Sequence, residues 1–192
     1  MRGSALGFTI KSGWACAVVL DASAKSPQVV TSQRIELSDP ANAQGRQPYH
    51  AGTGTARKPG PQLEKLIASV EEFGRRSVDA FIREHEKAGR RFAGAGIVVG
   101  SLIDPAQIAN DHIRIHALEG QLFRGIVKAA ADHREVASYI WRERDIYGSA
   151  ASQLRRSESA VRQAVAEFGR SVEGPWRAEH KAAALAAWLV IA

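Results

Sequence analysis

The chain has 192 residues, which suits a single domain over 1–192, and it is 45% hydrophobic and 24% charged, as in an ordinary globular protein. Its net charge of +6 and pI of about 9.8 suit a polyanionic partner, and equally an arginine-rich protein that binds nothing acidic. The one cysteine, Cys16, excludes an internal disulfide and is expected to be a small core residue. The longest apolar run, 182–192, is shorter than the ~20 residues that span a bilayer, so we expect a cytoplasmic protein without membrane association.

The N-terminal stretch predicts a β-hairpin. Strand-forming residues occupy 5–10 and 14–20, and the turn at 11–13 includes Gly13, which can adopt positive φ without strain. Both arms carry more apolar residues than simple alternation provides, which is typical of a central strand covered on both faces. A further strand at 28–36 would complete an antiparallel meander.

The segment 37–60 is rich in proline and glycine and predicts a long loop, and such loops in compact domains are usually functional or disordered. It has no acidic residue between positions 40 and 62, and Tyr49 and His50 add side chains that contact bases or phosphates. The predicted nucleic-acid-binding residues are Lys11, Ser12, Arg46, Arg57 and Lys58. The alternative is a solvated loop and an exposed turn that bind nothing.

The remainder of the chain alternates helices and strands. A 3.6-residue apolar period predicts a long helix from Pro61 to near Gly89, and the small residues of the next strand, 91–100, allow a helix to pack closely above it. Asp111 is the expected N-cap of a helix that runs to about 129. The other expected elements are a strand at 135–142, helical segments at 146–154 and 159–168, and an alanine-rich helix at 177–192 that packs on the sheet.

Histidine and glutamate recur on one face of the predicted helix that follows Asp111. His112, His116 and Glu119 are spaced i, i+4 and i+7, and a histidine pair at i, i+4 is a spacing found in zinc sites. They are the candidate metal ligands, with a divalent metal as the cofactor, and His116, Glu119 and His180 are the candidate catalytic residues. In the alternative interpretation they form a hydrogen-bonded cluster, in which Glu119 pairs with Arg114 or Arg124.

The order of elements and three stretches resemble the ribonuclease H-like fold, and within it the RuvC-type Holliday junction resolvases. The stretches are 5–15, an apolar strand followed by a turn and a Gly-aromatic pair; 146–165, a turn and helix; and 180–186, which ends in Ala-Leu-Ala. The resemblance implies an α/β, three-layer fold in which a five-stranded mixed sheet with an N-terminal antiparallel meander is flanked by helices. It also implies a homodimer and DNA or RNA as a partner.

The resemblance further implies a two-metal nuclease site, in which roughly three or four carboxylates hold two divalent ions about 4 Å apart. The corresponding positions are Thr9 in the first strand, 98–101 at the end of the fourth strand, and His180 and Ala183 in the last helix. None of these is a carboxylate. Ordinary two-metal cleavage is therefore not expected.

Three hypotheses follow. The leading one is a catalytically degenerate RuvC-like domain that binds nucleic acid or a protein partner. The alternative is a divergent metal-dependent phosphodiesterase that uses the His/Glu cluster. An ATP-binding relative of the sugar kinases ranks last, because it requires glycine-rich phosphate loops and an aspartate in the first hairpin.

Overall fold

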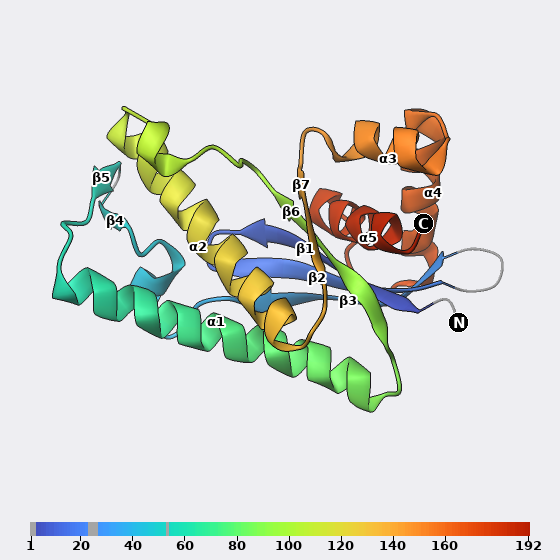
Figure 1. Cartoon of the computed structure of the whole chain (residues 1–192), viewed down its shortest axis with the longest axis horizontal. Coiled ribbons are helices and arrows are strands. Elements are labelled where there is room, and N and C mark those ends of the chain that lie inside the picture. The colour runs from blue at the N-terminus through green and yellow to red at the C-terminus, as the bar shows by residue number, and fades with distance from the viewer. Residues whose placement is uncertain (1–2, 23–26, 53) are drawn as a thin grey trace.

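The computed structural model describes residues 3–22, 27–52 and 54–192 (Figure 1). Its strands are β1 (Ser4–Lys11), β2 (Trp14–Ala22), β3 (Pro27–Glu36), β4 (His50–Gly52), β5 (Thr55–Ala56), β6 (Phe92–Val99) and β7 (Ser138–Arg142). Its α-helices are α1 (Pro61–Lys87), α2 (Asp111–His133), α3 (Ile146–Leu154), α4 (Glu158–Phe168) and α5 (Ala178–Ile191). Short 3-10 helices are η1 (Ala43–Arg46), η2 (Pro105–Gln107) and η3 (Gly169–Ser171). Within these residues, no helix combines the length and apolar character that crossing a membrane requires.

A five-stranded mixed sheet forms the middle layer, with the strand order β3-β2-β1-β6-β7. The first three strands pair antiparallel, as the predicted meander requires, while β6 and β7 add to β1 in parallel. β1 is the central strand and is buried along almost its whole length, which confirms the interpretation of its unbroken apolar run. Gly13 takes φ +79° in the turn between β1 and β2, as predicted.

Helices cover both faces of the sheet, so the fold has the three layers that the resemblance implied (Figure 1). α1 and α2 pack on the face that carries Leu6, Phe8 and Ala17. α5, with α3 and α4 around it, packs on the opposite face, which carries Cys16 and Val18. Cys16 is 1% exposed, and burial raises the pKa of its thiol to about 12, so it is the core residue that was expected.

α5 approaches the sheet closely because glycines face it. A Cβ on Gly7 of β1 would lie 1.9 Å from the carbonyl oxygen of Ala183, and one on Gly96 of β6 would lie 2.6 Å from that of Ala186. The predicted close packing of a helix on the small residues of β6 is confirmed. The residues of α5 from Ala182 to Leu189 are all buried, which agrees with its alanine-rich composition.

Two local predictions are corrected. The segment 37–60 is not an irregular loop throughout, because it contains η1 and the small antiparallel hairpin of β4 and β5. These elements are too short to leave an apolar period in the sequence. The N-cap of α2 is Asn110 rather than Asp111, since the Asn110 Oδ1 accepts a hydrogen bond from the Ile113 backbone N–H at 3.1 Å. Asp111 instead lies in the first helical turn, where it pairs with Arg114.

Candidate functional site

The N-terminal half of α2 presents His112, His116 and Glu119 on one face, as the spacing predicted. His112 and His116 are exposed, and their ring centroids lie 4.7 Å apart. Glu119 is one helical turn further on and only 2% exposed, so its carboxyl group lies beneath the two imidazoles. The pairing of Glu119 with Arg114 or Arg124, which belonged to the alternative interpretation, is not formed: Arg114 pairs with Asp111, and Arg124 donates to the Ser101 carbonyl.

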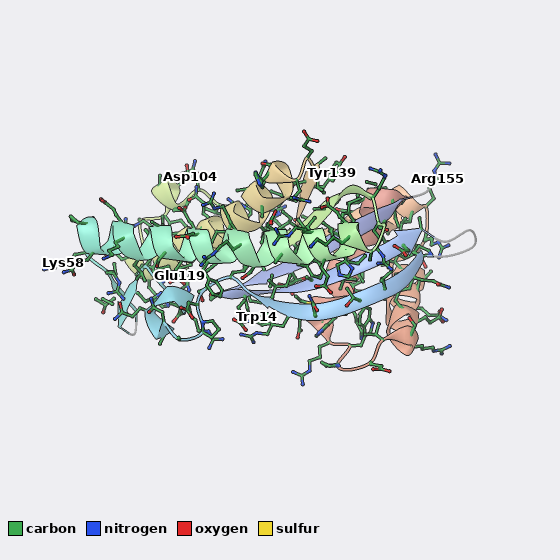
Figure 2. All side chains as sticks on the ribbon, turned by 90° about the horizontal axis from the view of Figure 1, so that it is seen from below. Trp14, Lys58, Asp104, Glu119, Tyr139 and Arg155 are labelled. Carbon is green, nitrogen blue, oxygen red and sulfur yellow. The ribbon has the colours of Figure 1, made fainter. Side chains whose placement is uncertain are left out.

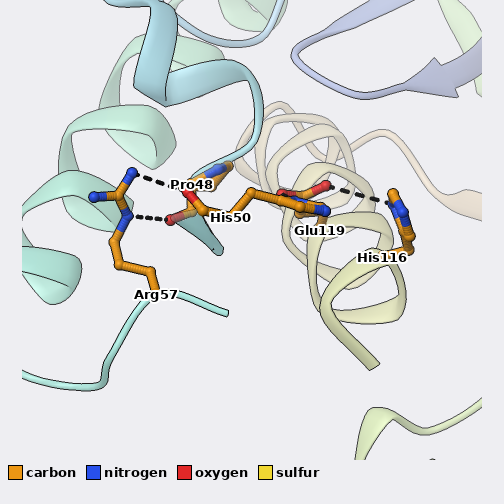
Figure 3. A network of polar contacts seen from close by, with 5 residues as sticks. All are labelled: Pro48, His50, Arg57, His116 and Glu119. Carbon is orange, nitrogen blue, oxygen red and sulfur yellow. Dashed lines mark hydrogen bonds and ion pairs between the residues drawn. The ribbon is translucent and has the colours of Figure 1, made fainter. Parts of the chain in front are cut away.

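The partner of Glu119 comes from the β4–β5 hairpin. His50 on β4 places its Nδ1 2.7 Å from the Glu119 Oε1 (Figure 3). The His50 ring also lies beside both helix histidines, with centroid separations of 4.8 Å to His116 and 6.2 Å to His112. The structure therefore adds a third imidazole to the pair seen in the sequence, and His50, His112 and His116 each offer one ligand atom within 4.8 Å of the others. We call these residues, with Glu119, the histidine cluster.

The protonation of the cluster is shifted by its surroundings. Burial raises the pKa of Glu119, and the hydrogen bond and charge of His50 oppose that rise. The pKa of His116 is lowered by burial first, and then by the neighbouring His50 and His112. The His116 ring is therefore biased towards its neutral form, which has a lone pair for a metal ion.

Arg57 fixes the hairpin that carries His50. Its Nε donates to the Pro48 carbonyl and its Nη2 to the His50 carbonyl, both at 3.0 Å (Figure 3). The backbone N–H of Arg57 donates to the Tyr49 carbonyl at 2.7 Å. The guanidinium group thus holds the backbone on which His50 sits. Its predicted role in binding nucleic acid stays a prediction.

A cleft of about 370 Å³ lies between α2 and the ends of β1 and β6, next to the histidine cluster. Its walls are mainly apolar, and His116, Lys11, Ser12 and Glu143 add polar groups. The Lys11 Nζ is 3.3 Å from the Glu143 Oε2, so this predicted phosphate ligand is already part of a half-exposed ion pair.

Among the other predicted nucleic-acid contacts, Ser12 and Arg46 lie close together, on either side of Gly13. Ser12 is exposed in the turn after β1, and Arg46 of η1 packs against the neighbouring Gly13 while its side chain remains exposed. Lys58 is exposed between the β4–β5 hairpin and α1, and Figure 2 shows it at the end of the molecule opposite Arg155. We call the set formed by Lys11, Ser12, Arg46, Arg57 and Lys58 the strand-end surface.

The structure does not bring His180 to the histidine cluster, because α5 lies on the opposite face of the sheet from α2. The His180 Nδ1 accepts the backbone N–H of Arg177 at 3.2 Å and so caps α5. Near it, the Thr9 hydroxyl donates to the Glu179 carbonyl at 2.8 Å, and Ala183 packs on Gly7.

Of the positions that the resemblance assigned to a two-metal site, Thr9, His180 and Ala183 carry a hydroxyl, an imidazole and a methyl group, and 98–101 contains no carboxylate. Divalent ions in such sites require carboxylate oxygens. The residues present at these positions do not fit a two-metal centre.

Comparisons with solved structures bear on the fold. One structure of Thermus thermophilus RuvC matches with a TM-score of 0.52 at 13% identity, covering 97% of this chain and 92% of that one. T. thermophilus RuvC in complex with Holliday junction substrate matches with a TM-score of 0.56 at 12% identity, covering 98% and 92%. The chain has a RuvC-like ribonuclease H fold. The yeast mitochondrial Holliday junction resolvase Ydc2 also matches, with a TM-score of 0.48 at 12% identity and coverage of 98% and 80%.

No protein-family model and no curated protein matches the sequence itself. The RuvC-like fold is thus recognised from the arrangement of its elements, although the sequences are only 12–13% identical. Sequence reasoning noted His50 as a base or phosphate contact and missed its place in the histidine cluster. The only signal was a lone histidine in a segment without acidic residues, 62 positions before His112, and no helical spacing links the two.

Proposed function

We propose that this protein binds nucleic acid through the strand-end surface and does not cleave it by two-metal chemistry. The observation that carries the proposal is that Ser12 and Arg46 are exposed together beside Gly13, with Lys58 exposed after the β4–β5 hairpin, on a RuvC-like fold. Arg46 and Lys58 have no ion-pair partner among the described residues, so their charges remain available to phosphates. T. thermophilus RuvC, whose fold this chain shares, has been solved with Holliday junction substrate, which supports a branched DNA as the first ligand to test.

The non-catalytic part of the proposal is supported by the opposite face of the sheet. Thr9 supplies a neutral hydroxyl that is already bonded to the Glu179 carbonyl, and Ala183 supplies a methyl group. Neither side chain supplies an anionic ligand for a divalent cation. We infer a domain that retains the fold of a resolvase and acts by binding.

Fluorescence-anisotropy titrations against duplex, single-stranded and four-way-junction DNA, in EDTA, test the binding. We expect affinity that falls steeply with salt, because phosphate contacts release counterions. The double variant Arg46→Glu/Lys58→Glu should weaken binding and reduce the slope of log K against log salt by roughly two.

The matched control is Arg83→Glu/Lys87→Glu, which makes the same change of charge at exposed positions in the C-terminal part of α1. We expect it to leave most of the affinity intact. Equal losses in the two double variants would show that only net charge matters and would contradict a defined surface. No binding at low salt would overturn the nucleic-acid proposal and direct the search to a protein partner.

A second candidate function, a divergent metal-dependent phosphodiesterase, is favoured by one observation. His116 belongs to the histidine cluster and also lines the cleft that holds Lys11 and Ser12. If this candidate is right, junction or single-stranded DNA should be cleaved in Zn²⁺ or Mn²⁺, and His116→Ala should remove the cleavage. Intact DNA in every metal tested would exclude it and leave the binding proposal unaffected.

A further inference from the structure

We propose that His50, His112 and His116 bind one transition-metal ion of the zinc class, with Glu119 as the carboxylate behind the ligands. This inference does not depend on nucleic-acid binding. It changes the ligand set expected from the sequence, because His50 enters it and Glu119 moves to the second layer around the ion.

The spacing of the rings suits a metal after a small adjustment. One nitrogen from each of the three histidines lies within 4.8 Å of one from each of the others. Tetrahedral coordination with Zn–N bonds of about 2.0–2.1 Å places the nitrogens roughly 3.4 Å apart. His112 and His116 are exposed, and turning their side chains about χ1 and χ2 brings the nitrogens closer without moving the helix backbone.

Glu119 prepares the rings to act as ligands. The His50 Nδ1 lies 2.7 Å from the Glu119 Oε1. When Nδ1 carries the ring proton it donates to that oxygen, and the His50 Nε2 keeps the lone pair that a metal needs. A carboxylate that orients a metal-binding imidazole in this way is the usual second layer of zinc sites. The contact between His50 and Glu119 thus favours the tautomer that a metal requires.

The second oxygen of Glu119 is an independent indication that the site is incomplete. Glu119 is 98% buried, and its Oε2 has no hydrogen-bond partner in the part of the chain that the structure describes. That oxygen lies 4.0 Å from the His116 Nδ1. Coordination through the His116 Nε2 would fix a proton on Nδ1, which then donates to Oε2 and satisfies it. One buried carboxylate would thus support two of the three ligands.

The donor set selects the class of metal. Imidazole nitrogens suit Zn²⁺, Cu²⁺, Ni²⁺ and Fe²⁺, whereas Mg²⁺ and Ca²⁺ require oxygen ligands. Three protein ligands leave the fourth position of a tetrahedral ion open to water or to an exogenous group. His116 lines the cleft, so a molecule in the cleft could reach the open coordination position of the ion.

A bound ion would join two distant parts of the chain, β4 and α2. Among the described residues, the β4–β5 hairpin has two register pairs of its own, His50 with Ala56 and Gly52 with Thr55. Gly54 in its turn lies against the His112 ring, since a Cβ there would be 3.3 Å from the His112 Nδ1. The ion is therefore expected to stabilise the hairpin, and with it the position of Arg57.

The test is a titration of the EDTA-treated, dialysed protein with Co²⁺, followed by its visible ligand-field absorption, and then displacement of Co²⁺ by Zn²⁺. We expect one equivalent of Co²⁺ to give an intense, tetrahedral-type spectrum and Zn²⁺ to remove it. His112→Ala and His116→Ala should each abolish the spectrum. Glu119→Gln should weaken Zn²⁺ binding by roughly 10- to 100-fold.

The matched control is His133→Ala, an exposed histidine at the other end of α2, which should bind the metal like the wild type. His112 is exposed, so its alanine variant should retain the far-ultraviolet circular dichroism of the wild type, and loss of binding then reflects the site. Absence of the tetrahedral spectrum in the wild type would overturn the proposal. So would equal binding by His112→Ala, His116→Ala and the wild type. Nucleic-acid binding measured in EDTA is independent of either result.

Discussion

Gly7→Ala is expected to destabilise the protein by roughly 3 kcal/mol, the upper part of the usual range for overpacking a core. The added methyl carbon would lie 1.9 Å from the Ala183 oxygen and 2.7 Å from its carbonyl carbon. These are backbone atoms of α5, which cannot turn aside as a flexible side chain can. The helix must therefore move off the sheet, and its contacts with β1 and β6 weaken. Urea unfolding, followed by circular dichroism, measures the loss.

The same substitution at Gly125 serves as the control. Gly125 is exposed in the middle of α2, and a Cβ there would meet no atom within 4 Å. Because alanine favours the helix over glycine, Gly125→Ala should stabilise the protein by about 1 kcal/mol. We therefore expect the free energy of unfolding to fall in Gly7→Ala and to rise in Gly125→Ala. A Gly7→Ala variant as stable as the wild type would contradict the close approach of α5 to β1.

Thr9→Asp is expected to destabilise the protein by roughly 3 kcal/mol at pH 7 without creating a nuclease. Thr9 is 1% exposed, and its hydroxyl donates to the Glu179 carbonyl. An ionised carboxylate has no proton to donate, so two acceptors would face each other in a buried place. Burial would raise the pKa of the new carboxyl above its value of about 3.9 in the unfolded chain. The penalty should therefore shrink as the pH falls through the folded pKa.

Thr9→Asn separates the effect of the charge from the effect of side-chain size. Asparagine has nearly the same size as aspartate but carries no charge, and its amide can donate to the Glu179 carbonyl. Its stability relative to the wild type should not change with pH. Mg²⁺ or Mn²⁺ should neither restore the stability of Thr9→Asp nor allow it to cleave junction DNA. Recovery of stability and cleavage in Mg²⁺ would mean that the other residues of this face still hold a cation, and that Thr9 alone keeps the wild type from cleaving.

The central strands and helices were accessible from the sequence because each of them leaves a local pattern. The apolar run of β1 has no polar face, and this requires helices on both sides. The 3.6-residue period of α1 marks that helix almost to its last turn. The small residues of β6 correctly indicate a close helix above it.

The histidine cluster could be predicted only in part. The two α2 histidines and Glu119 share a helix, so their spacing is enough to place them on one face. His50 joins them through a hairpin that side-chain bonds from Arg57 to backbone carbonyls hold in place. Such bonds leave no periodic signal, and β4 and β5 are too short to leave one. The N-cap of α2 could not be predicted for a similar reason. Asn110 and Asp111 are adjacent, and the sequence alone does not show which of the two side chains caps the helix.

The position of α5 late in the chain has a consequence for biosynthesis. All five strands of the main sheet are complete at Arg142, but α5, the central helix of the layer on one face, begins only at Ala178. While residues 143–177 are being translated, the nascent sheet presents bare apolar side chains, among them Val18, Leu20 and Val98. Exposed sheets of this kind are the species that aggregate and that chaperones protect. Folding on the ribosome should therefore stall at an incomplete two-layer intermediate, and a chaperone that shields this face should raise the yield of native protein more than one that acts after release.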